Sequence, residues 1–179
     1  VRDLNGHLVI SHDPATIDNS FLAEDLFSYY FEINCQSTLA LNIKSDGLQA
    51  LLGKAIDKTG VSLEHLFVFD MSFPDLYQYL RTNVPRYTRI SDVEPEPLLI
   101  ESCQGIWLDN FNGTSCNTDL AAEYLVANVA VSFVSPELHG RGHEPVWSKI
   151  KEKKLDEDTN FFLCTDFPES AYDYFEDTE

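Results

Sequence analysis

The residues of this chain that could do chemistry lie where short apolar runs end. They are His12, Asn42 with Lys44, Asp70, Ser91 with Asp92, Trp107 with Asp109, Ser135 with Glu137, and Thr165 with Asp166. If the runs are parallel strands of a barrel, their carboxyl ends meet at one rim, where the active sites of such barrels are built. The pattern therefore predicts a site made of these side chains.

His12 and Lys44 could carry different parts of an ester hydrolysis. The unperturbed pKa of histidine, about 6.5, suits proton transfer near neutral pH. A lysine can place positive charge where the transition state of a phosphate ester gathers negative charge. Strand alternation puts Asn42 and Lys44 on one face, opposite Leu41 and Ile43. We therefore predict that Asn42 and Lys44 point into the site.

Further candidates could contact the substrate. They are Asn42, Arg89, Trp107, Asp109 and Glu137. Trp107 could instead be a core residue, as strand tryptophans usually are, and Arg89 and Glu137 could be an ion pair at the rim.

The loop after Glu137 carries a cluster of basic residues between glycines. Its members are His139, Arg141 and His143. This set could bind a phosphate or a metal ion, although loop histidines are more often solvated.

The order of the elements favours a parallel α/β fold. Asn5-Gly6 predicts a hairpin turn before the apolar run 8–10. We expect further strands at 38–44, 66–70, 87–91, 105–109, 128–134 and 160–164, and helices at 47–58, 74–82, 118–126, 145–154 and 168–175. With polar residues at the strand ends and no glycine-rich nucleotide motif, this alternation predicts one domain over residues 1–179, an α/β barrel.

The strongly negative net charge of the chain argues against nucleic acid as its partner. Thirty acidic and twelve basic residues give a net charge of −18, which repels nucleic acid and requires any phosphate site to be locally positive. No apolar run reaches the roughly 18 residues of a membrane span, and the four cysteines form no CxxC pair. We expect a cytoplasmic protein with reduced thiols, and the oligomeric state stays open.

Three segments resemble the glycerophosphodiester phosphodiesterase family. Residues 1–14 (VRDLNGHLVISHDP) are similar to the family's hairpin, apolar strand and His-Asp-Pro sequence. Residues 39–44 (LALNIK) resemble its third-strand motif, which is normally written with Glu two residues before Lys. Residues 161–168 (FFLCTDFP) are similar to its last strand and loop.

The resemblance implies a (β/α)₈ barrel whose first strand is absent from this chain. It also implies hydrolysis of a small glycerophosphodiester or phospholipid-headgroup substrate by two histidines and Mg²⁺ or Ca²⁺. His12 matches the second histidine, and the other histidine and two metal-binding acids would lie before Val1. Asn42 stands where the family has a metal-binding Glu, so no confident metal ligand remains.

Two alternatives stay open. A barrel that lost its metal ligand at Asn42 could bind a phosphorylated ligand without cleaving it. Asp109 and Glu137 could also serve a sugar-processing barrel as an acid and nucleophile pair.

Overall fold

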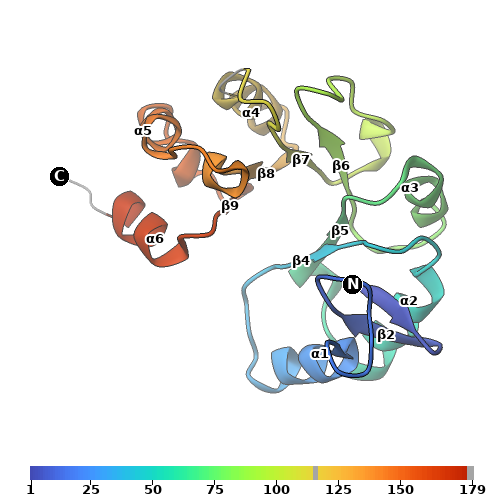
Figure 1. Cartoon of the computed structure of the whole chain (residues 1–179). Coiled ribbons are helices and arrows are strands. Elements are labelled where there is room, and N and C mark those ends of the chain that lie inside the picture. The colour runs from blue at the N-terminus through green and yellow to red at the C-terminus, as the bar shows by residue number, and fades with distance from the viewer. Residues whose placement is uncertain (115–116, 177–179) are drawn as a thin grey trace. The chain divides into compact units, whose positions relative to one another are not determined.

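The computed structural model describes residues 1–114 and 117–176 (Figure 1). Within it the chain forms two compact units, Val1–Tyr87 and Thr88–Glu179. Each unit is described by itself, and the prediction of a single domain stays a prediction.

The first unit opens with a small antiparallel sheet. β1 (Arg2–Leu4) and β2 (His7–Ile10) form the expected hairpin, and β3 (Phe21–Leu22) pairs with the other edge of β2. The hairpin turn needs positive φ at both central positions, which Asn5 and Gly6 supply at 50° and 81°. Two helices, α1 (Ala23–Glu32) and α2 (Gln49–Thr59), contact each other and β2.

The second sheet of this unit is parallel and two-stranded. β4 (Leu39–Asn42) pairs with β5 (Leu66–Phe69), and the short 3₁₀ helix η1 (Leu63–His65) precedes β5. Every residue of β5 is buried, as is usual for a parallel strand covered on both faces. α3 (Phe73–Tyr79) follows, and Ser72 caps it by accepting the Asp75 N–H at 3.3 Å.

The second unit is built on a four-stranded parallel sheet of the Rossmann-like type. Its strands lie in chain order: β6 (Tyr87–Ile90), β7 (Gly105–Leu108), β8 (Ala130–Val134) and β9 (Phe161–Cys164). Its helices are α4 (Thr118–Val126), α5 (Glu144–Glu152) and α6 (Pro168–Glu176), with 3₁₀ turns η2 (Ile100–Ser102), η3 (Pro136–His139) and η4 (Leu155–Glu157).

The core of the second unit joins one face of this sheet to its helices. Ile106, Leu108 and Phe133 from the strands pack in one cluster with Trp147 and Ile150 from α5. Side chains alternate across a strand, so the residue between Ile106 and Leu108 must lie on the opposite face. Ile106 and Leu108 therefore face the core from β7. Trp107, and Asp109 just beyond the strand, lie on the opposite face.

The barrel predicted from the sequence is wrong. The strands of the described residues form separate sheets of three, two and four strands, and no closed barrel is present among them. A barrel requires every strand to be hydrogen-bonded on both sides around a closed ring. Here β1–β3 make an antiparallel sheet of their own, and β9 ends its sheet at an edge.

Candidate functional site

A histidine and a carboxylate meet at the carboxyl ends of β7 and β8. Asp109 follows β7, and its N–H continues the strand ladder to the Ile90 carbonyl at 2.9 Å. His139 is the last residue of η3, just after β8. Its Nε2 lies 2.6 Å from Asp109 Oδ1, and the histidine side chain is 22% exposed against 9% for the aspartate. The pair is fixed, and solvent can still reach the ring.

Glu137 is bound by donors on both of its oxygens. The hydroxyls of Ser135 and Thr165 each donate to one oxygen, and the Asp166 N–H donates to the second of these at 3.3 Å. Burial alone would raise the pKa of Glu137, but these hydrogen bonds outweigh it and lower the pKa. Glu137 is therefore a carboxylate at neutral pH that joins the ends of β8 and β9.

His143 adds a second histidine beside this carboxylate. Its Nδ1 lies 3.9 Å from Glu137 Oε2, and its ring lies 4.0 Å from that of Trp147, centroid to centroid. The Trp147 indole N–H donates to Ser135 Oγ at 2.8 Å. Trp147 thus connects the buried core to the groups that hold Glu137.

Arg141 ties two loops of this site together. Its guanidinium donates to the carbonyls of Asn110 and Phe111. Gly113 lies against the same side chain: a Cβ there would come within 3.0 Å of Arg141 Nε, at a φ of +71°. The positive φ and this close approach therefore favour glycine at position 113 of the loop after β7. Two N–H groups of Arg141 are already engaged by backbone carbonyls.

The residues singled out in the first unit are arranged differently. His12 is 90% exposed in its side chain, with Nδ1 3.0 Å from Asp13 Oδ1, and Lys44 is exposed two residues beyond β4. Arg2, which the sequence did not point to, donates to the carbonyls of His12 (3.1 Å) and Lys44 (3.0 Å). The structure therefore links the backbones of His12 and Lys44 through Arg2, and both side chains are exposed.

Asn42 lies beside one carboxylate, that of Asp70. Its Nδ2 is 3.4 Å from Asp70 Oδ2, and its Oδ1 is buried without a hydrogen-bond partner. Among residues 1–114 and 117–176, no group of three or more His, Cys, Asp or Glu side chains is placed to hold a metal ion. The described residues therefore offer no carboxylate cluster of the kind that Mg²⁺ or Ca²⁺ prefers.

The last two candidates, Arg89 and Trp107, lie in an ion pair and inside a strand. Arg89 forms an ion pair with Glu94, whereas Glu137 is held by Ser135, Thr165 and Asp166. Trp107 is 8% exposed within β7, opposite Ser132 of β8.

The arrangement of the second unit suits proton transfer. An ionised aspartate only accepts hydrogen bonds, so His139 Nε2 carries the proton and Nδ1 is left as the base. The lowered pKa of Glu137 argues against its donating a proton as the acid of a sugar-cleaving pair, and both of its oxygens accept hydrogen bonds. His139 was a weak candidate in the sequence because its partner is 30 residues away.

Neither a membrane-spanning helix in the described residues nor a match to a known protein narrows the function of the chain. In the part of the chain that the structure describes, no helix has the length and apolar character needed to cross a membrane. Compared with protein-family models, with curated proteins and with solved structures, the chain matches none.

Proposed function

We propose that this chain hydrolyses a phosphodiester by general acid–base catalysis, with His139 as the base and Asp109 as its partner. The observation that carries the proposal is the 2.6 Å contact between His139 Nε2 and Asp109 Oδ1 at the ends of adjacent parallel strands. The substrate class rests on the resemblance of residues 1–14 and 39–44 to phosphodiesterases.

The reaction would follow from the tautomer that Asp109 selects. Nδ1 of His139 removes a proton from water as the water oxygen bonds to phosphorus and the ester P–O bond breaks. The imidazolium that forms is stabilised by the Asp109 carboxylate and returns the proton to the leaving alkoxide. Glu137 takes no part in proton transfer and holds the loop that carries His139.

The experiment is turnover of bis(p-nitrophenyl) phosphate and of a glycerophosphodiester by the whole chain as pH is varied. We expect turnover that falls about 10²-fold or more in His139→Ala, and His7→Ala, a change at an exposed histidine on β2, to leave turnover unchanged. A chain that turns over neither diester at any pH would overturn the proposal.

A second candidate function is binding of a phosphorylated ligand without cleavage. The observation that favours it is Asn42, a neutral side chain next to Asp70 where the resembled family has a metal-binding Glu. Calorimetry with inorganic phosphate and glycerol phosphate tests it. Binding that Lys44→Ala weakens, in a chain without turnover, would support the binder.

A further inference from the structure

Helix α1 presents an apolar stripe to solvent. The stripe consists of Leu22, Leu26, Tyr29 and Ile33, which follow one another at intervals of four, three and four residues and so share one face of the helix and its two caps. Leu22, Tyr29 and Ile33 are exposed, Tyr29 by 59%, and Leu26 is half-buried. The stripe runs for roughly 16 Å along the helix. Apolar side chains gathered on one exposed face are typical of an interaction surface.

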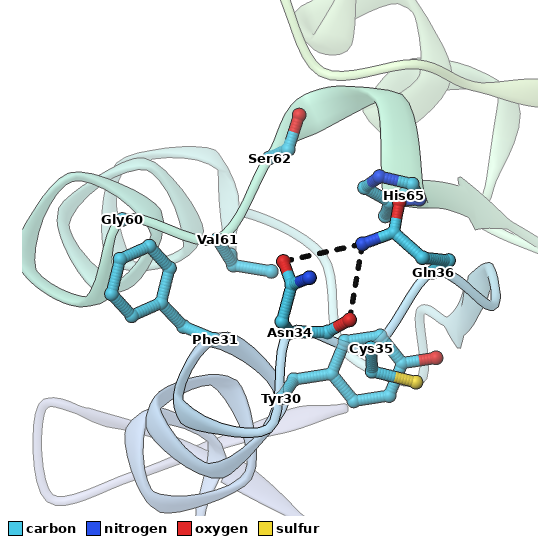
Figure 2. Close-up of a pocket in the computed structure, with 9 residues that line it drawn as sticks. All are labelled: Tyr30, Phe31, Asn34, Cys35, Gln36, Gly60, Val61, Ser62 and His65. Carbon is cyan, nitrogen blue, oxygen red and sulfur yellow. Dashed lines mark hydrogen bonds between the residues drawn. The ribbon is translucent and has the colours of Figure 1, made fainter.

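The other faces of α1 are fastened to the rest of the first unit. Phe27 is fully buried, and the helix contacts α2 and β2. Near the carboxyl end of α1, the Phe31 ring lies beside Gly60 at the end of α2, as Figure 2 shows, and a Cβ on Gly60 would come within 3.5 Å of it. Glu24 forms an ion pair with Lys58 of α2. The stripe is therefore held on a fixed helix, away from the face that packs.

Carboxylates flank the stripe along one side. Asp25 and Glu32 are both exposed, and they lie four residues before Tyr29 and three residues after it, which makes each a neighbour of Tyr29 on the helix surface. Residues 3–43 contain no lysine or arginine, so the segment that carries the stripe has no strongly basic side chain of its own. The surface therefore combines an apolar centre with a negative rim.

This charge pattern selects among the possible occupants. A second copy of the chain would bring the same carboxylates against each other, and each copy carries a net charge of −18. An anionic membrane surface would be repelled for the same reason. A partner with positive charges beside its own apolar residues is complementary to both the centre and the rim.

We propose that the apolar stripe of α1 is a docking surface for a basic amphipathic helix of a partner protein. The apolar residues of that helix, spaced three and four apart, pack along the stripe. Lysines or arginines beside them face Asp25 and Glu32 and fix the orientation of the partner. Docking here is independent of the hydrolysis proposed for the second unit.

Calorimetry with two synthetic peptides tests the surface on the whole chain. The first is a helical peptide of about 18 leucines and lysines, with the leucines three and four residues apart, and the second has glutamate in place of every lysine. We expect the lysine peptide to bind one to one and more weakly as salt is added, and the glutamate peptide not to bind. Equal binding of both peptides, or saturable binding of neither, would overturn the proposal.

Tyr29→Ser locates the binding, because it removes the largest side chain of the stripe. The dissociation constant of the lysine peptide should rise about tenfold or more. Tyr172→Ser is the matched control: Tyr172 is also an exposed tyrosine on a helix, flanked by the exposed Glu169 and Asp173 of α6. Equal losses in the two variants, or none in Tyr29→Ser, would contradict the assignment to α1.

The rim is tested by reversing its charge. Asp25→Lys combined with Glu32→Lys should weaken the lysine peptide about tenfold and allow the glutamate peptide to bind. Glu169→Lys combined with Asp173→Lys makes the same change in net charge on α6 and should leave the preference between the peptides unchanged. A shift in preference that is the same for both pairs would show that only the overall charge of the chain is read.

Two further measurements separate the partner helix from other occupants of the stripe. Sedimentation velocity would reveal a dimer that Tyr29→Ser dissociates, and flotation with phosphatidylcholine vesicles would reveal membrane binding that Tyr29→Ser abolishes. We expect Tyr29→Ser to change neither measurement. A change in the first would assign the stripe to a second copy of the chain and a change in the second to a membrane, and either would overturn the proposal.

Discussion

The two units treat their strand-end polar residues in opposite ways. In the first unit, His12 and Lys44 have exposed side chains, and Arg2 links them by donating to their backbone carbonyls. In the second, Asp109 and His139 are paired through their side chains and mostly buried. A sequence motif can therefore mark one region while the side-chain geometry that the proposed catalysis requires lies in another.

The difference arises from what each strand end is attached to. Beyond β8, the chain turns at once into η3, and Trp147 and Glu137 hold that turn against the core and against β9. Beyond β2, the chain enters a turn in which the Ser11 hydroxyl donates to the Asp13 carbonyl at 2.8 Å, which leaves His12 in solvent. Catalytic geometry needs the first kind of support.

The largest effect on stability should come from the residue that supports the second unit's site. Trp147 is 2% exposed and donates to Ser135, so Trp147→Ala should lower the free energy of unfolding by about 3–5 kcal/mol. Urea denaturation measures this, with Val126→Ala, at a residue 90% exposed, as a control that should change it by less than about 0.5 kcal/mol. Equal losses would mean that the site is not held by this core.

Asp109→Asn tests the pairing without removing the histidine. The amide can present N–H to His139 Nε2 and so reverse the tautomer, and turnover should fall about 10²-fold while the fold is kept. Asp119→Asn is the matched control, because Asp119 is an exposed aspartate paired with Lys153. Steady-state kinetics measures kcat/KM for both variants. Comparable values of kcat/KM for Asp109→Asn and Asp119→Asn would show that Asp109 does not act in the proposed mechanism.

Glu137 should make the second unit sensitive to acid. Because its pKa is lowered on folding from an ordinary value of 4.5, its contribution to stability is present above that pH and is lost as pH falls through the folded pKa. Glu137→Gln should lose about 1–3 kcal/mol at pH 7, and its difference from the unchanged chain should shrink below about pH 4.5.

Denaturation at pH 7 and pH 4 measures this difference. Glu94→Gln is the control: the pKa of Glu94 is also lowered, chiefly by the Arg89 hydrogen bond, but its side chain is 46% exposed and its loss should cost under about 1 kcal/mol. A pH-independent effect of Glu137→Gln would show that the charge is not what stabilises this turn.

The smallest effect is expected in the first unit, at Asn42. Asn42→Glu replaces a donor 3.4 Å from Asp70 with a second carboxylate, and stability should fall by about 1 kcal/mol at neutral pH. Calorimetry with Ca²⁺ supplies the second readout. Tightened Ca²⁺ binding with unchanged stability would contradict this account and favour a metal site of the resembled family.

Local structure was predictable because its signals are local. The hairpin at Asn5-Gly6 and the helix Thr118–Val126 are both as the sequence predicts. α1 was missed, and its N-cap, Leu22, makes no side-chain capping bond, so the usual start signal is absent.

The closure of the sheet and the pairing of distant side chains could not be predicted from local signals. The order of strands and helices is shared by a barrel and an open parallel sheet, and which strands bond is decided by long-range packing. The sequence named Asp109 and Glu137, but the spacing of 30 residues between Asp109 and His139 gives no periodic signal. Arg2 was missed because its role lies in two backbone carbonyls, 10 and 42 residues away.

The central claim is that His139, and not His12, is the base. The direct measurement is kcat/KM for bis(p-nitrophenyl) phosphate with His139→Ala and His12→Ala chains prepared in parallel and checked for equal folding. We predict a loss of about 10²-fold or more for His139→Ala and less than about threefold for His12→Ala. The reverse order would contradict the account and return the catalytic role to the motif of the first unit.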